Sequence, residues 1–185
     1  GNPTAPNYNP LFDRDGNLRT DADIAKTVPF LRAIVIFNES YNHLSDRKDE
    51  VNALLKQLYG IDLSNGIQIE DINGFGNPTA PNYNPLFDRD GNLKSDKEIA
   101  DTLLFLRAIV VFVEAWRRLP DKKQGVNELL RDFYGIDLSN GIQIEDVDGF
   151  GNAKAPQYNP LFDKDGNLKS DKDIREVLVF FRAVV

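Results

Sequence analysis

Three short segments of the chain place several side-chain oxygens close together, which is the arrangement that a hard cation such as calcium requires. Each segment has the pattern Asp-x-Asp-Gly-Asn. Their oxygen-bearing side chains are those of Asp13, Asp15, Asn17, Asp88, Asp90, Asn92, Asp163, Asp165 and Asn167. The glycine favours the positive φ of a tight turn, and Asp and Asn side chains can bond to their own backbone. The pattern therefore fits either a calcium loop or a structural turn or short hairpin.

The pattern resembles part of the calcium loops of EF-hand and dockerin modules, and this resemblance implies calcium as the ligand. An EF-hand loop has its glycine at position 6 and a bidentate glutamate at position 12. With Gly91 at position 6, Leu86 stands at the first position and Lys97 at the last. Because of this departure, a structural turn remains the alternative interpretation. We call the segments at 9–18, 84–93 and 159–168 the opening turns.

A second turn rich in Asp and Asn precedes two of the opening turns. It contains Asp71 and Asn73 in one place, and Asp146 and Asp148 in the other. A proline-rich stretch separates each such turn from the opening turn that follows. We hypothesise that the two turns together supply one calcium site at each joint.

The proline-rich stretch at residues 76–85 is predicted to be an extended connector, because its three prolines disfavour both a helix and a central strand. It is either a plain linker or a packed strap that docks Tyr83 and Phe87 on a neighbour. Tyr8 and Tyr158 occupy the places equivalent to Tyr83.

These segments recur because the whole chain is built on a period of 75 residues. Residues 1–75 form one copy, 76–150 a second, and 151–185 the beginning of a third. Residues 1–18 are identical to residues 76–93. A constant period of this length predicts tandem supersecondary units or small domains. The boundary of the folded unit stays open, because a fold can be circularly offset against its repeat.

Composition narrows the class of protein. The chain has 185 residues, 28% of them charged, and a formal net charge of −7. This acidic balance disfavours nucleic acid as a partner, because it would repel phosphate. Cysteine is absent, which excludes disulfides and thiolate metal ligands. Methionine is also absent, and this favours a fragment or a processed piece of a longer protein.

A long helix is predicted in the middle of each copy. In the second copy, apolar residues follow helical spacing over about residues 96–119, and Ser95 with Glu98 forms a capping box. The apolar run at 103–113 is shorter than the roughly 20 residues needed to span a membrane. Because the helix is apolar nearly all round, neighbouring repeats or an identical chain should cover it. Pro29 is predicted to bend the helix of the first copy.

A shorter amphipathic helix is predicted from the helical spacing of Val126, Leu129, Leu130 and Phe133, with Gly135 as its C-terminal cap and Gly60 in the same place in the first copy. Asn140-Gly141 follows between short alternating runs, and this pair predicts a β-hairpin with a type I′ turn. The predicted fold class is therefore mostly α with short β-hairpins (α+β). Each tandem 75-residue repeat would contain a long buried helix, a shorter amphipathic helix and a hairpin, and the repeats would pack head-to-tail in an array.

One arginine recurs inside the apolar helix, at Arg32, Arg107 and Arg182. A buried arginine must be paired and hydrogen-bonded. The acidic pairs at residues 70–71 and 145–146 are candidate partners. We predict structural ion pairs in preference to an anion-binding site.

Catalysis has little support in the residues. The single histidine, His43, is replaced by Arg118 in the second copy, so it is predicted to lie on the surface. No nucleophile elbow, phosphate-binding loop or histidine-rich metal motif is present. We therefore expect a protein that is not an enzyme.

Two functions fit these features. The first is a structural tandem-repeat segment of a larger extracellular or surface protein, such as a spacer, adhesin stalk or filament element, stiffened by calcium at the turns. Its partners would be neighbouring repeats or identical chains. The alternative is a helical repeat module that binds a lipid or another hydrophobic ligand on its surplus apolar surface.

Overall fold

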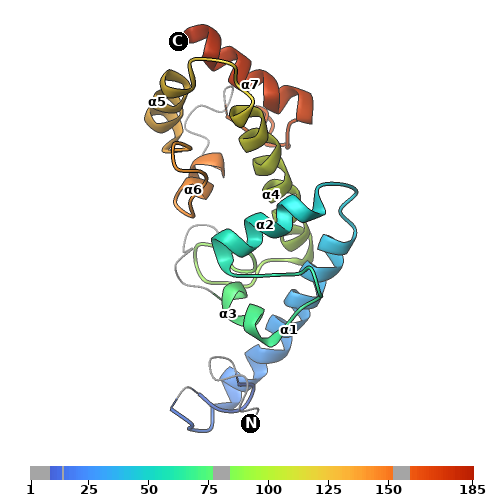
Figure 1. Cartoon of the computed structure of the whole chain (residues 1–185). Helices are drawn as coiled ribbons and strands as arrows, with labels where there is room; N and C mark the ends of the chain where they lie inside the picture. Colours follow the sequence, from blue (N-terminus) through green and yellow to red (C-terminus); the bar gives the residue numbers. More distant parts are fainter. Residues whose placement is uncertain (1–8, 14, 77–83, 152–158) are drawn as a thin grey trace. The chain divides into compact units, whose positions relative to one another are not determined.

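The computed structural model describes residues 9–13, 15–76, 84–151 and 159–185. Their regular structure is helical, and Figure 1 shows the path of the helices. The helices are α1 (Asp21–Asn42), α2 (Lys48–Tyr59), the 3-10 helix η1 (Ile69–Asp71), α3 (Ile72–Phe75), α4 (Asp96–Arg117), α5 (Lys123–Tyr134), α6 (Asp146–Gly151) and α7 (Asp171–Val184). None of these helices is long and apolar enough to cross a membrane. The tyrosines of the predicted strap, Tyr8, Tyr83 and Tyr158, lie outside the described residues.

The prediction of an α+β fold with β-hairpins is wrong. The described residues contain no strand, and their β pairing is limited to isolated antiparallel bridges across the opening turns. These bridges are Phe12–Leu18, Phe87–Leu93 and Phe162–Leu168. A single bridge closes a turn without extending into a ladder, so the fold class of the described residues is all-α.

The Asn-Gly pairs form turns that differ from the type I′ turns of hairpins. Gly66 and Gly141 have φ values of 74° and 76°, whereas the preceding Asn65 and Asn140 do not have positive φ. A type I′ turn needs positive φ at both central residues. Here the glycine closes the turn, and the Gly66 N–H donates to the Leu63 carbonyl oxygen at 3.1 Å. The flanking segments therefore leave the turn without pairing as strands.

The chain divides into two compact units, Gly1–Leu103 and Leu104–Val185, and the division falls inside α4. The prediction of 75-residue repeats packed head-to-tail in an array is wrong, because the compact units do not coincide with the copies in the sequence. The physical reason is that an opening turn packs on the long helix of the copy before it. The copy boundaries at 1–75, 76–150 and 151–185 stay a prediction.

In the first unit, α1, α2 and α3 supply a buried apolar core. Phe37 of α1 and Phe75 of α3 are fully buried and meet edge to face, with ring centroids 5.2 Å apart. Val51 and Leu55 of α2 are also fully buried. Each of the three helices therefore contributes fully buried apolar side chains to this unit.

In the second unit, the same type of contact joins α4 to α6. Phe112 and Phe150 are fully buried, with ring centroids 5.2 Å apart. Helix α7 packs against α5, where the ring of Phe181 lies near those of Phe133 and Tyr134, at 6.4 and 6.0 Å between centroids. The aromatic residues thus fix both long helices of this unit to the shorter ones.

An opening turn docks on the long helix in each unit. In the first unit, Phe87 stacks on Phe30 of α1 with ring centroids 6.0 Å apart. In the second unit, Phe162 stacks on Phe105 of α4 at 5.9 Å. The planes of the rings are inclined by 21° and 20°, so the two contacts have nearly the same geometry. The same stacking of an opening-turn phenylalanine on a long helix therefore occurs in both units, 75 residues apart in the sequence.

The recurring arginines form ion pairs, as predicted, but the predicted partners are wrong. The pairs are Arg32–Asp96, Arg107–Asp171 and Arg182–Asp121. Asp71 and Asp146, two of the predicted partners, are buried and accept hydrogen bonds from backbone N–H groups instead. The expectation of a buried arginine also fails for Arg32, whose side chain is 64% exposed.

The predicted helix caps are confirmed, although α4 ends at Arg117 and not at about residue 119. The Ser95 N–H donates to a Glu98 carboxylate oxygen at 2.8 Å, and the Glu98 N–H donates to the Ser95 hydroxyl at 3.4 Å, which completes the capping box. Gly60 and Gly135 end α2 and α5 in the left-handed conformation. Helix α1 continues through Pro29, and the predicted bend there stays a prediction.

The buried leucine of each docked opening turn should carry much of the stability of its unit. Leu86 and Leu161 are fully buried, whereas Leu11, at the same place in the first copy, is 44% exposed. We expect Leu86→Ala and Leu161→Ala each to lower the free energy of unfolding by about 2–5 kcal/mol. Leu11→Ala should change it by less than about 0.5 kcal/mol. Urea denaturation of the three variants measures this, and an equal loss in Leu11→Ala would contradict the prediction.

Candidate functional site

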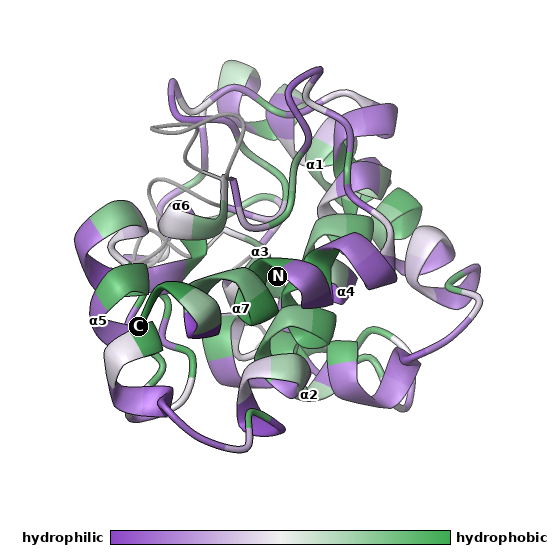
Figure 2. Ribbon diagram, turned by 90° about the horizontal axis from the view of Figure 1, so that it is seen from above, coloured by the Kyte–Doolittle hydropathy of each residue, from purple (hydrophilic) through white to green (hydrophobic). Residues whose placement is uncertain are grey.

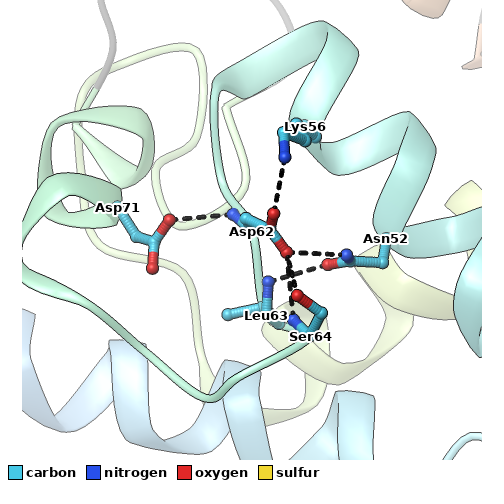
Figure 3. A network of polar contacts seen from close by, with 6 residues as sticks. All are labelled: Asn52, Lys56, Asp62, Leu63, Ser64 and Asp71. Atoms are coloured by element: carbon cyan, nitrogen blue, oxygen red, sulfur yellow. Dashed lines mark hydrogen bonds and ion pairs between the residues drawn. The ribbon is translucent and has the colours of Figure 1, made fainter.

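Each unit contains a polar network that holds the loop after its shorter helix. In the first unit this loop runs over residues 61–68, between α2 and η1, and Figure 3 shows its contacts. In the second unit the equivalent loop runs over residues 136–145, between α5 and α6. These are the segments that the sequence predicts to be hairpins, so the network explains what replaces strand pairing there.

Asp62 is the centre of the first network. One of its carboxylate oxygens accepts hydrogen bonds from the Asn52 side-chain amide at 2.9 Å and from the Ser64 hydroxyl at 2.6 Å. Its other oxygen accepts from the Lys56 ammonium at 2.7 Å. The Asn52 carbonyl in turn accepts from the Leu63 N–H at 2.7 Å. Two residues of α2 thus hold the beginning of the loop.

Asp71 holds the loop from its other end. It is only 3% exposed, and its two carboxylate oxygens accept from the backbone N–H groups of Asp62, at 2.8 Å, and of Gln68, at 2.7 Å. Asp146 makes the same two bonds in the second unit, both at 2.7 Å. Each buried carboxylate therefore supplies the acceptors that a partner strand would supply in a hairpin.

The second network has the same design with one basic residue exchanged. The Asn127 amide donates to Asp137 at 2.8 Å, and its carbonyl accepts from the Leu138 N–H at 2.8 Å. The Ser139 hydroxyl donates to Asp137 at 2.6 Å. Arg131 stands where the first network has Lys56, and its guanidinium lies 3.6 Å from the Asp137 carboxylate.

Hydrogen bonds lower the pKa values of Asp62 and Asp137, whereas burial raises the pKa of Asp146. Donation from the Asn52 side chain, more than any other contact, holds the pKa of Asp62 well below its usual range. Donation from the Ser139 side chain is the main contact that lowers the pKa of Asp137, to about 2. Burial raises the pKa of Asp146, although two N–H groups bond to its carboxylate. All three carboxyl groups are structural acceptors.

The opening turns are built on a carboxylate that is already hydrogen-bonded. One oxygen of Asp88 accepts from the N–H groups of Asp90 and Asn92, at 3.0 and 2.8 Å. Asp13 and Asp163 make the same two bonds in the other turns. The bond from the Asn92 N–H is the main cause that lowers the pKa of Asp88. Part of the oxygen set proposed for calcium is thus used by the turn itself.

The predicted cation residues are not gathered into one cluster. Among the described residues, which include all thirteen of them, no group of three or more histidine, aspartate or glutamate side chains is placed to hold a metal ion. Asp71 and Asp146 bond to backbone N–H groups, as described above. Asn73 and Asp148 lie within the short helices α3 and α6 and not in a second turn. Calcium binding at these positions stays a prediction.

A groove with a volume of about 560 Å³ lies beside the docked opening turn of the first unit. Its lining includes the apolar residues Pro29, Phe30, Phe87 and Leu93 and the charged residues Arg19, Asp23 and Lys26. The second copy has Leu104 and Asp101 where the first has Pro29 and Lys26. The lining of the groove is therefore not a repeated feature of the chain.

His43 is exposed just after α1, and this confirms its prediction as a surface residue. Its ring Nδ1 lies 2.7 Å from the Glu39 carbonyl oxygen. This contact is local to the end of the helix, so it does not bring the ring to any of the carboxylates of the networks.

Sequence reasoning missed Asn52 and Asn127, the residues through which the shorter helices hold the loops. A signal was present, because this asparagine is identical in two helices that otherwise differ at several positions. It also missed the role of Gly149. A Cβ atom there would lie 2.5 Å from the Tyr134 carbonyl oxygen, so the glycine permits a close approach to the end of α5.

Comparison with protein-family models, curated proteins and solved structures found no match to this chain. Arguments about function therefore rest on the residues themselves and on the equivalence between the copies.

The lowered pKa of Asp137 should make stability depend on pH in acid. A carboxyl group with a pKa of about 2 in the folded state and about 3.9 in the unfolded state stabilises the fold fully above about pH 5. This stabilisation is lost as the pH falls through about 2. We expect Asp137→Asn to flatten the dependence of the urea midpoint on pH over this range. Asp132→Asn, an exposed change on α5, the helix that precedes this loop, is the control, and an equal flattening there would contradict the prediction.

Calcium has a direct test in thermal melts of the 185-residue protein. If the opening turns bind calcium, as the sequence predicts, the melting temperature should be higher in calcium than in excess chelator at matched ionic strength, and the rise should be smaller in Asp90→Ala. An equal melting temperature in both solutions would contradict calcium binding, and the carboxylates of Asp13, Asp88 and Asp163 would then serve the backbone N–H groups of the turns alone.

Proposed function

We propose that this chain is a structural segment of a repeat protein, which acts as a spacer in a stalk or filament at a cell surface or outside the cell. The observation that carries the proposal is the repeated junction between copies. Phe87 on Phe30 and Phe162 on Phe105 have centroid distances of 6.0 and 5.9 Å and nearly equal ring inclinations. A spacer needs such a junction, because a fixed separation requires the same joint at every step.

An ion pair supports the aromatic contact at each junction. Arg32 of α1 donates to Asp96 at 2.5 Å, and Arg107 of α4 donates to both oxygens of Asp171, at 2.8 and 3.1 Å. The second pair is bidentate and less exposed, so it restricts orientation more strongly than a single surface contact. The aspartate begins the next long helix in both cases, so the contact also orients that helix.

The proposed role is non-catalytic. The carboxyl groups with shifted pKa values, Asp62, Asp137 and Asp146, are engaged by amides, hydroxyls and basic side chains that hold loops. A general acid or base needs a position from which it can reach a substrate proton. Acidic charge, lack of cysteine and near-identical copies favour an extracellular structural role, and calcium in the opening turns would be an added feature of it.

The alternative, a module that binds a hydrophobic ligand, has the groove of the first unit in its favour. Its lining combines aromatic rings with Arg19 and Lys26, which would suit an amphipathic anion. The second copy has an acidic residue, Asp101, in place of Lys26. Such binding would therefore belong to one copy, whereas the junction occurs in both units, and for this reason we favour the spacer.

The spacer proposal predicts a fixed distance between successive opening turns. The chain lacks cysteine, so Asp15→Cys and Asp90→Cys introduce two unique sites for spin labels. Both positions are exposed, and the turn uses their backbone N–H groups. We expect pulsed electron paramagnetic resonance to give one narrow distance distribution. Phe30→Ala should broaden it, because Phe87 then loses the ring on which it stacks.

Val28→Ala is the matched control, because this residue lies on the same helix and is 71% exposed. It should leave the distribution narrow. A broad distribution in the protein without these changes would contradict the spacer, since the segment would then behave as a flexible tether.

A further inference from the structure

The sequence contains three Asn-Gly pairs, and the structure gives them two different settings. Asn65-Gly66 and Asn140-Gly141 lie in the turns of the loops that follow α2 and α5, whereas Asn73-Gly74 lies within α3. The three asparagines are all exposed and hydrophilic, the class coloured purple in Figure 2. Exposure of the side chain therefore does not distinguish the pairs, and the difference lies in the backbone of the glycine that follows.

An Asn-Gly pair can lose ammonia without an enzyme, because asparagine is thermolabile and glycine has no Cβ to hinder its backbone nitrogen. In the first loop, the Gly66 nitrogen attacks Cγ of Asn65 and forms a C–N bond. The bond from Cγ to Nδ2 breaks, and ammonia leaves with the proton that the glycine nitrogen gives up. Water then opens the resulting succinimide ring at either carbonyl carbon. The products are aspartate and isoaspartate, in which the main chain runs through Cβ.

The two loop turns leave room for this attack. A Cβ atom built on Gly66 or Gly141 would meet nothing within 4 Å outside the adjacent residues, so the backbone there is not packed against another element. The N–H groups of these glycines donate to the carbonyl oxygens of Leu63 and Leu138, both at 3.1 Å. The restraint on each attacking nitrogen is thus a hydrogen bond of the turn itself.

The backbone of Gly74 is buried and tightly packed. A Cβ atom there would lie 2.3 Å from the Tyr59 carbonyl oxygen and 2.6 Å from Cγ1 of Ile61, so the glycine lies directly against the end of α2. For its nitrogen to reach Cγ of Asn73, the peptide unit between the two residues must rotate and this contact must separate. Opening a packed element costs more free energy than opening a surface turn.

We propose that Asn65 and Asn140 are sites of spontaneous deamidation in the folded protein, and that the packing of α3 protects Asn73. Water is the co-reactant, so no enzyme or cofactor is needed. This inference goes beyond the spacer role and does not depend on it, because it uses only the loops that follow the shorter helices.

The reaction loosens each loop at its turn. The Gln68 side-chain amide donates to the carbonyl oxygens of Asn65 and Gly66, at 3.1 and 3.3 Å. Gln143 bonds to the equivalent pair in the second loop, both at 3.3 Å. Isoaspartate adds one carbon to the main chain and displaces the first of these carbonyl groups, and either product adds one negative charge. The same covalent change therefore accumulates with time in both loops.

The test follows the three asparagines in one molecule. The 185-residue protein is incubated at mildly alkaline pH, in buffer and in urea concentrated enough to unfold it. Cleavage after glutamate places the asparagines on separate peptides, residues 51–70, 71–98 and 129–145. Mass spectrometry with electron-transfer fragmentation then measures aspartate and isoaspartate on each peptide. In buffer, we expect Asn65 and Asn140 to react faster than Asn73 by about tenfold or more. In urea, the three should react at similar rates, because no packing remains.

Asn65→Ala is the variant that assigns the site. It should abolish the change on peptide 51–70 and leave the change at Asn140 as it was, and a thermal melt shows that this exposed substitution does not unfold the protein. Comparable rates at Asn65 and Asn73 in buffer would overturn the proposal, because the packing of α3 would then give no protection. Absence of reaction at Asn65 or Asn140 in buffer would also overturn it, whatever the rates in urea.

Discussion

The stacking of an opening-turn phenylalanine on the preceding long helix is the contact on which both units depend. The long helix has an apolar face that the elements of its own copy leave incomplete, although Val28 and Val35 on the same helix are exposed. In the first unit, the ring of Phe30 is covered by Phe87, which belongs to the next copy in the sequence. The compact unit therefore ends beyond the sequence copy, and its boundary falls at Leu103, inside the next long helix. The offset between sequence period and folded unit is a direct consequence of this contact.

The opening turn can serve as a docking element because bonds within the turn itself hold its backbone. Asn84 and Asp88 each hold two backbone N–H groups of the turn through one side-chain oxygen. The same oxygen-rich pattern resembles that of a calcium loop. A carboxylate that bonds to N–H groups and one that binds a cation need the same residue types at similar spacing. Residue types alone therefore do not distinguish these two uses.

Local rules predicted the helices and their caps, because these depend on residues within one or two turns of each other. The pairing of the arginines was predicted from the cost of burying an unpaired charge. The partners of the arginines could not be predicted, since Arg107 meets Asp171, 64 residues further on. The prediction of hairpins was wrong for a related reason. Asn140-Gly141 is a valid local signal, but Asn127 and Asp146 bond to the backbone of the first segment of the loop. Acceptors from outside the turn decide the pairing, and no local pattern contains them.

The repeat gives an internal test of how far residue type determines burial. Leu11 and Leu86 lie in segments of identical sequence, and both turns have the same hydrogen bonds from their asparagines. One leucine is 44% exposed and the other is fully buried. Neither propensity nor local conformation can account for this difference, because both are the same. Burial here is a property of the helix that lies beside the turn. In both turns whose phenylalanine stacks on a long helix, the leucine is fully buried.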